Sequence, residues 1–406
     1  MKFMTTTALA LVAAFAVPAS AQKPAAPAAA QPTQVVKPSS KALKAIIELQ
    51  TAVNKNDTAN IPAKVAAAQA VASTKDDRYL IGQLQLKAAL AAKDDAATTA
   101  AIDTIAASGY LDAAKIAELY VSLGSTMYNN KQYPQAVAAF QKAAAANPSN
   151  PEATTLLGEA LFAQGQKAEA VSAFQRAVQA RVAAGQKPDE ALIKRAVGVA
   201  YEAQSPAAVD LARQWVAAYP SNASWSDAIA IYRNLSHPDI EGTLDLLRLM
   251  NAMGALKGAG ECGLYARAAS EQNNFNEAQA VLDAGIAAKV VNPTSAEFRD
   301  LVGGLKTKPK ATAADLAAAT KSAQSGMALL RIGDRYYAMG DYAKAVELYK
   351  MSMGKPGVDT AVANLHIGMA LTRAGDKAGA TAALNAVTGP RADIAKFWLA
   401  YLNQKG

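Results

Sequence analysis

Residues 120–148 read YVSLGSTMYNNKQYPQAVAAFQKAAAANP, and the same pattern returns in residues 154–177, TTLLGEALFAQGQKAEAVSAFQRA. The Leu-Gly pair ending at Gly124 corresponds to the pair ending at Gly158, a shift of 158 − 124 = 34 residues. The small and aromatic residues that follow keep their spacing: Ala136, Phe140 and Ala143, then Ala170, Phe174 and Ala177. A period of this length predicts helix hairpins that stack on one another.

Each repeated residue type has a physical role in such a hairpin. Gly124 and Gly158 lie on the first helix, where the missing side chain lets the second helix cross closely. We expect Phe140 and Phe174 to fill the space between one hairpin and the next. Pro148 lacks a backbone donor and therefore ends the second helix. These roles predict an α-helical repeat rather than a sheet.

The pattern resembles the signature of the tetratricopeptide repeat family. A third unit follows with a shortened turn: Gly198, Tyr201, Ala208, Ala212, Trp215 and Pro220. Two more units lie near the C-terminus: Gly333, Tyr336, Ala345 and Tyr349, then Gly368, Leu371, Ala380 and Leu384. The resemblance covers residues 117–220 and 326–388, about half of the chain without its first 21 residues. Elsewhere, as at Ile81-Gly82 and 274–278, the match is weaker.

The resemblance implies an all-α solenoid of helix hairpins wound as a right-handed superhelix. Composition agrees, because 51% of the residues are hydrophobic but only 6% are aromatic, so the apolar content is mostly Ala, the best helix former. We expect two arrays joined near 291–325. The expected parts are a signal peptide at 1–21, a flexible Ala/Pro-rich tether at 22–40, an N-terminal array at 41–290, a joint at 291–325, and a C-terminal repeat pair with a capping helix at 326–406.

The N-terminus has the pattern of a bacterial signal peptide. Lys2 precedes an apolar run, Pro18 breaks that run, and Ala19-Ser20-Ala21 has the small-x-small form that signal peptidase cleaves. The run is shorter than the roughly 20 residues that a membrane span needs, and no later segment is long and apolar enough to span. We therefore expect cleavage near Ala21, a periplasmic or secreted location, and no transmembrane segment.

The charge pattern argues against a nucleic-acid partner. The formal net charge is +8, but positive and negative residues are interspersed, whereas a nucleic-acid interface shows clustered Lys and Arg with aromatics between them. The run from Lys306 to Lys310 is interpreted as a solvated linker. Contact of this run with an anionic envelope polysaccharide is the alternative.

Residues for catalysis or metal binding are sparse. His237, His366 and Cys262 are the only His and Cys residues, and their separation predicts neither a metal site nor a nucleophile pair. Residues 258–263, GAGECG, spell G-x-G-x-x-G, but the dinucleotide motif requires a preceding strand, and residues 245–253 read as helix. We expect no catalytic residue, no cofactor and no enzyme. A hydrolase or transferase with an unrecognised site remains an alternative.

Binding is the remaining function, and the family resemblance implies that the first helices line a concave groove. Residues one, four and five after the signature glycine, and the residue three before it, are expected to lie at this groove. The candidate groove residues are Tyr128, Asn129, Glu159, Phe162, Arg195, Glu202, Asp334, Tyr337, Met369 and Arg373. The aromatic members are interpreted as anchors for a peptide, with packing against the neighbouring hairpin as the alternative. We therefore expect an exported scaffold that binds a protein or peptide during envelope assembly or secretion.

Overall fold

The computed structural model describes residues 36–404, and this part of the chain is all-α. Within that range the residues form twenty-one α-helices, one 3₁₀ helix and no strand. The helices are α1 (Leu43–Asn54), α2 (Ile61–Val71), α3 (Lys75–Ala92), α4 (Asp95–Ala107), α5 (Ala113–Asn129), α6 (Tyr133–Ala146), α7 (Pro151–Ala163), α8 (Lys167–Ala183), α9 (Glu190–Glu202), α10 (Ala207–Ala218), α11 (Asn222–Ser236), α12 (Ile240–Ala252), α13 (Ala259–Glu271), α14 (Phe275–Ala287), α15 (Arg299–Lys306), α16 (Ala313–Ser322), α17 (Gly326–Ala338), α18 (Tyr342–Met353), α19 (Thr360–Ala374), α20 (Lys377–Asn385), η1 (Gly389–Arg391) and α21 (Ala392–Gln404).

The glycines of the repeat pattern lie where the two helices of a hairpin meet. A Cβ atom on Gly124 would lie 2.7 Å from the ring of Phe140. One on Gly158 would lie 2.9 Å from the ring of Phe174. Three further glycines meet the second helix of their hairpins in the same way: Gly82 at Ile105, Gly333 at Tyr349 and Gly368 at Leu384. Phe140 and Phe174 therefore pack on the glycine of their own hairpin. The prediction that they fill the space between one hairpin and the next is wrong.

The third unit has a different register from the one that the sequence pattern predicts. In the regular units a turn residue with positive φ follows the glycine by seven positions, as Lys131 follows Gly124. The turn residue of α9 and α10 is Gln204, and seven positions before it is Val197, which is buried. Gly198 is exposed, and a Cβ atom there would meet nothing within 4 Å. The prediction that Gly198 lets the second helix approach is wrong.

The reason is an exchange of volume between the two helices of this unit. The helix start is tightened, because the amide of Ala208 donates to the carbonyl of Ser205 whereas Ala136 donates to Gln132 one residue further back. Four positions after Ala208 the slot that Phe140 fills in the earlier unit holds Ala212. A small residue on the second helix thus accompanies the larger Val197 on the first, and the total volume is nearly kept.

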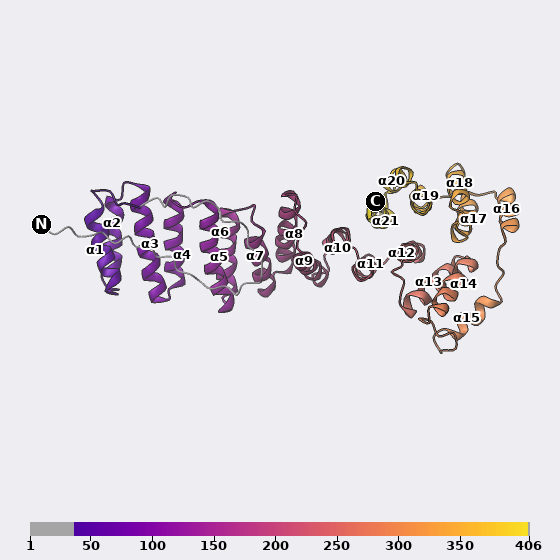
Figure 1. The fold of residues 1–406 in the computed structure, drawn as a ribbon, viewed down its shortest axis with the longest axis horizontal. Coiled ribbons are helices and arrows are strands. Elements are labelled where there is room, and N and C mark those ends of the chain that lie inside the picture. The colour runs from indigo at the N-terminus through magenta and orange to yellow at the C-terminus, as the bar shows by residue number, and fades with distance from the viewer. Residues whose placement is uncertain (1–35, 405–406) are drawn as a thin grey trace, which may run out of the picture.

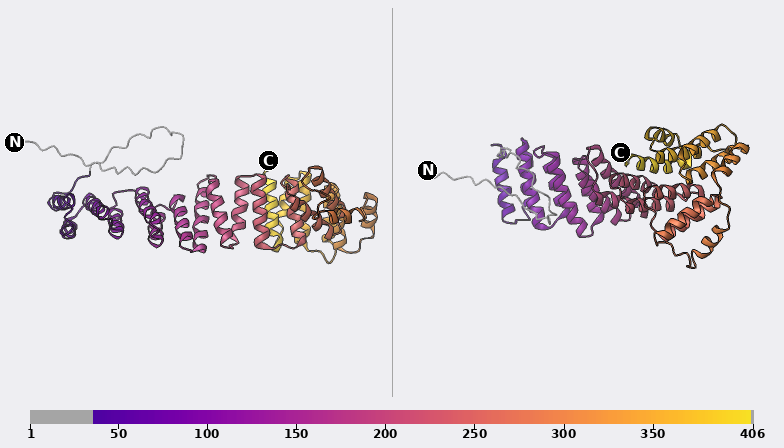
Figure 2. Two further views of the ribbon diagram at one scale, coloured as in Figure 1. Left: turned by 90° about the horizontal axis from the view of Figure 1, so that it is seen from below. Right: turned by 45° about the vertical axis from the view of Figure 1, so that its right-hand side comes forward.

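The hairpins form an open row that ends in a closed cluster (Figure 1 and Figure 2). From α1 to α11 the helices follow one another along the long axis, each hairpin packing on the next. From α12 to α16 the chain continues outward, and α17 to α20 lead back (Figure 1), so that α21 packs on α10 and α12 as well as on α19 and α20. The C-terminal helix was expected only to cap the last pair; it also closes the second half of the chain onto the first.

The structure also describes the segments expected to be irregular. Residues 291–325 contain α15 and α16, while α14 packs directly on α17. At the end of the expected tether, Ser39 donates from its amide to Asp77 at 2.7 Å, so residues 36–40 are held against α3. The expected signal peptide and the rest of the tether lie outside the described residues. Among residues 36–404, no helix combines the length and the apolar content needed to cross a bilayer.

Gly158, which is packed, and Gly198, which is open, provide a test of the assigned register. Gly158→Ala should lower the free energy of unfolding by about 1–3 kcal/mol, because the new methyl group overlaps the Phe174 ring. Gly198→Ala should leave it unchanged or raise it by up to about 1 kcal/mol, since Ala is the better helix former and the space is open. Denaturant unfolding followed by circular dichroism measures both. Equal losses in the two variants would contradict the assigned register.

Candidate functional site

A row of aromatic residues lines the first helices of the N-terminal array. Tyr128 on α5, Phe162 on α7 and Tyr201 on α9 each lie four positions after the glycine slot of their unit. All three are half-buried and pack on the core. The ring of Tyr128 lies 5.5 Å from that of Tyr133, so Tyr128 also packs on the second helix of its own hairpin.

Glu159 and Arg195 connect two of these helices. Arg195 Nε and Nη2 donate to the two carboxylate oxygens of Glu159 at 2.8 and 2.7 Å, and its guanidinium lies 4.8 Å from the centre of the Phe162 ring. The hydrogen bonds to Glu159 raise the pKa of Arg195 above its usual range. Burial, and then the nearby Glu159 charge, raise the pKa of Tyr128. Tyr128, Glu159, Phe162 and Arg195 therefore form one continuous surface.

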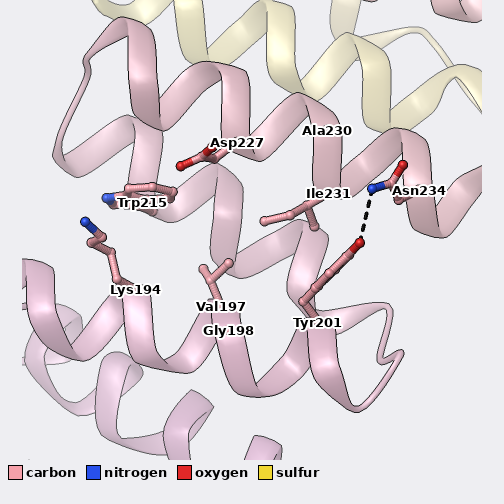
Figure 3. A pocket seen from close by; sticks show the side chains of 9 residues that line it. All are labelled: Lys194, Val197, Gly198, Tyr201, Trp215, Asp227, Ala230, Ile231 and Asn234. Carbon is pink, nitrogen blue, oxygen red and sulfur yellow. Dashed lines mark hydrogen bonds between the residues drawn. The ribbon is translucent and has the colours of Figure 1, made fainter.

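A cavity of about 330 Å³ continues this surface between α9 and α11 (Figure 3). Its walls are Lys194, Val197, Gly198 and Tyr201 on α9, Trp215 on α10, and Asp227, Ala230, Ile231 and Asn234 on α11. Asn234 donates to the Tyr201 hydroxyl at 3.1 Å, and the ammonium group of Lys194 lies 5.4 Å from the Trp215 ring centre. Within residues 36–404, neither Lys194 nor Asp227 forms an ion pair.

The corrected register explains which predicted residues of α9 belong to the groove. Counting from Val197, the groove positions are Lys194, Gly198 and Tyr201, all of which line the cavity. Arg195 was predicted from the shifted register and still contacts Glu159. Glu202 instead pairs with Lys167 at the start of α8, at 2.9 Å, and it does not line the cavity. The positive-φ turn at Gln204 is the signal that would have given the right register.

Asn129 ends α5 and is exposed beside Tyr128. The structure gives it no hydrogen bond among the described residues, so its place in the groove follows only from its position on the helix. Tyr128 remains the α5 side chain that the structure brings into contact with neighbouring groove residues.

In the C-terminal pair the predicted open groove is wrong. Asp334 is 3% exposed, Met369 is 1% exposed and Tyr337 is 8% exposed. The reason is that α12 of the same chain occupies the space that the first helices α17 and α19 would present. All nine residues from Gly242 to Met250 are buried. Only Arg373, which is half-buried, keeps partial access to solvent.

A buried ionic network joins α12 to the helices around it. Arg248 donates through Nε and Nη2 to Glu277 on α14, both at 2.8 Å, and through Nη1 to Asp245 at 3.1 Å. The ring of His366 on α19 lies between two carboxylates, 3.2 Å from Asp245 and 2.9 Å from Asp334. The side chains of this network come from α12, α14, α17 and α19, which explains why no single stretch of sequence predicted it.

The pKa values of His366 and Asp334 in this network are strongly shifted. Burial by itself would lower the pKa of His366, but the charges of Asp245 and Asp334 outweigh it and raise the pKa to about 10. Burial would raise the pKa of Asp334, yet the charges of His366 and Arg248 hold it well below its usual range. At neutral pH the ring is therefore a cation between two anions. An ion pair of this kind holds its helices in one arrangement, because removing one partner would leave a buried charge uncompensated.

The groups in this network face one another rather than a ligand. Salt bridges continue it to the N-terminal end of α12, from Arg331 to Glu241 at 2.8 Å and from Arg391 to Asp239 at 2.7 Å. Among the described residues, no group of three or more His, Cys, Asp or Glu side chains could hold a metal ion. A sequence signal did exist, since Asp245 and Arg248 lie three residues apart in an otherwise apolar run, which predicts a paired and buried charge.

Because of His366, the free energy of unfolding should depend on pH. Its pKa is about 10 in the folded chain and about 6.5 in an unfolded one, so its contribution to stability is complete below about pH 6.5 and is lost as the pH rises towards 10. The free energy of unfolding should fall between pH 7 and 9.5 by a few kcal/mol, since one pKa unit corresponds to about 1.4 kcal/mol. His366→Gln should flatten this fall, whereas His237→Asn, at the other histidine, should not. Parallel profiles for wild type and His366→Gln would contradict the assignment.

Comparisons with known proteins identify the repeats. Family models described as tetratricopeptide repeat match residues 122–181 and 327–352. No curated protein sequence matches the chain. It is similar to a tetratricopeptide repeat protein from Parabacteroides merdae (14% identity, 63% of this chain and 98% of that one, TM-score 0.26). It is also similar to pilF of Pseudomonas aeruginosa (13%, 65% and 97%, 0.23) and to the TPR2AB domain of yeast Sti1 in complex with pHSP90 (11%, 71% and 96%, 0.26). Family models thus match in both halves, so the chain contains tetratricopeptide repeats at residues 122–181 and 327–352.

Proposed function

We propose that this protein is an exported scaffold of the bacterial cell envelope that binds a protein partner along α5, α7, α9 and α11. Tetratricopeptide repeat proteins are generally protein-binding scaffolds. The observation that supports this surface is the contrast between the two halves of the chain. The groove positions of α17 and α19 are filled by α12, whereas those of α9 and α11 border a cavity that no other part of the described chain occupies.

The chemistry of the open surface favours a peptide segment of mixed character. Tyr128, Phe162 and Tyr201 provide aromatic anchors on three successive first helices, and aromatic residues dominate binding energy at protein interfaces. Lys194 and Asp227 provide one unpaired charge of each sign at the cavity. A partner with apolar side chains between single charged residues would therefore match this surface.

The pairing of Lys and Arg side chains within the chain argues against an anionic polysaccharide as the partner. Arg195 is neutralised by Glu159 and Lys167 by Glu202. In the basic run, Lys310 donates to the carbonyls of Leu305 and Lys308, so its ammonium group is engaged by its own chain. Lys306 and Lys308 are the lysines of this run that stay exposed, and a polyanion requires a longer row of accessible positive charges.

The partner can be trapped from the groove itself. A photo-crosslinking residue at Ile231, which lines the cavity, should give discrete adducts in intact cells, and the same residue at Ser172, exposed on α8, should not. Mass spectrometry of the adducts identifies the partner. Tyr201→Ala combined with Phe162→Ala should reduce the Ile231 adduct by about tenfold or more, as expected for removal of two anchors. Val182→Ala, which removes an exposed apolar residue elsewhere, is the matched control.

Salt separates protein from polysaccharide partners. Raising the ionic strength from about 0.1 M to about 0.5 M should weaken an aromatic groove contact little, but should abolish binding that depends on exposed Lys and Arg. Adducts that disappear with salt, or that form equally from residues 231 and 172, would overturn the proposal.

Export is tested separately at the N-terminus. The full chain, produced in a Gram-negative host, should be found in the periplasmic fraction with Gln22 as its first residue. Replacing both Ala19 and Ala21 with Gln should leave the precursor uncleaved, because signal peptidase requires small residues there. Ala13→Val, which keeps the apolar run, should be processed normally. A chain that stays in the cytoplasm with Met1 intact would contradict the proposed location.

A further inference from the structure

A second cavity, separate from the proposed groove, lies in the C-terminal half of the chain. It has a volume of about 460 Å³, is open to solvent, and is lined by α12, α13 and α14 on one side and by α17, α18 and α19 on the other. These helices surround the same region in Figure 1. The volume is within the range of about 300–1,000 Å³ that small-molecule sites occupy.

Arg373 gives this cavity an uncompensated positive charge. Its Nε atom donates to the Tyr342 hydroxyl at 3.1 Å, and its guanidinium lies 5.5 Å from the centre of the Tyr342 ring. Among residues 36–404 it forms no ion pair, although it is half-buried. The groups that face it are phenols, so its remaining N–H donors are available to an anion in the cavity.

Tyr337 adds an unpartnered donor at the same wall. The side chain is 8% exposed and lines the cavity, yet its hydroxyl makes no hydrogen bond within the described chain. Burial raises the pKa of Tyr337, which keeps the phenol protonated and able to donate. The hydroxyl is therefore free to donate to a group that enters the cavity.

The other charges at the cavity cancel one another. Arg248 and Glu277 both line it, but they form a bidentate pair. Glu277 also accepts from the Tyr265 hydroxyl at 2.8 Å and from Asn274 at 2.6 Å. The carboxylate is therefore saturated, and Arg373 sets the sign of the charge that a ligand would meet.

The opposite wall is apolar and open. Ala280 and Ala284 on α14 and Ala288 at its C-cap follow one another at intervals of four, so they lie on one face of the helix and line the cavity. Val281 on the same helix extends this wall. Since Ala side chains leave room, an apolar group of several carbon atoms can lie along α14 with its polar end at Arg373.

We propose that this cavity binds a small carboxylate that carries an apolar chain, with the carboxylate held by the guanidinium of Arg373 and the hydroxyl of Tyr337 and the chain lying along α14. The assignment rests on an unpaired cation and an unpartnered donor that share one cavity, together with an apolar wall opposite them. It requires neither the groove of α5–α11 nor the partner proposed for it.

Calorimetric titration with decanoate tests the site on the full-length mature protein. Decanoate should bind, and decyltrimethylammonium, which has the same chain and the opposite charge, should bind at least tenfold more weakly. Arg373→Gln should reduce the decanoate affinity by about tenfold or more, as expected for loss of a charged hydrogen bond. Arg267→Gln, at an exposed arginine of α13 outside the cavity, should leave it unchanged.

A pair of variants on one helix tests the place of the apolar chain. Ala284→Phe should fill the cavity and abolish decanoate binding, whereas Ala287→Phe, on the same helix but outside the cavity, should not. Circular-dichroism melts show whether each variant stays folded. No decanoate binding by the wild type, equal binding of the cationic probe, or equal binding by both Phe variants would overturn the proposal.

The carboxylate could come from a free fatty acid or from the C-terminus of a peptide. An acetylated peptide ending in Leu, with a free or an amidated C-terminus, distinguishes these sources by competition with decanoate. Competition by the free acid alone would assign the site to a peptide C-terminus, and no competition by either peptide would assign it to a free acid. Competition by the amidated peptide would overturn the role of the carboxylate.

Discussion

The buried guanidinium of Arg248 is the constraint that determines the second half of this structure. It is 2% exposed, and a charge removed from water must be paired and hydrogen-bonded or the fold loses several kcal/mol. Its partners are Asp245 on its own helix and Glu277 on α14. Asp245 in turn requires His366 on α19. Satisfying one cation therefore places two helices, α14 and α19, against α12, and the solenoid cannot stay open at this point.

The same family of hairpins thus gives two different surfaces. In the N-terminal array the ion pair of Arg195 and Glu159 joins two neighbouring first helices and stays partly exposed, so it orders the groove without filling it. In the C-terminal half the corresponding positions meet α12, and Asp334 and Met369 become core residues. Closure is reinforced by α21, where Trp398 donates to the carbonyl of Asp245 at 3.3 Å. An open row and a closed cluster follow from one repeat.

The sequence was sufficient to predict the helix hairpins, which depend on neighbours along the chain. The 34-residue period predicted the hairpins, although Phe140 was expected between hairpins and packs instead on Gly124 of its own unit. It was insufficient wherever a contact joins distant units. Asp245 and His366 are 121 positions apart, and no period relates them. The shift at Val197 was missed for a different reason, since a glycine one position later imitates the signature and only the turn conformation reveals the difference.

The repeat pattern predicted Tyr337 and Arg373 as recognition residues, and this prediction was only partly informative. The groove positions of a repeat carry side chains that can contact another helix. In this chain that helix is α12, whose Arg248 guanidinium lies 5.4 Å from the centre of the Tyr337 ring. One helix cannot cover every position on the surrounding first helices, and Arg373, at the end of α19, extends beyond it. The residual cavity is therefore a consequence of the closure itself. Because α12 fills the groove of α17 and α19, a pocket remains where α12 ends. Its wall includes groove residues that would otherwise have faced a partner.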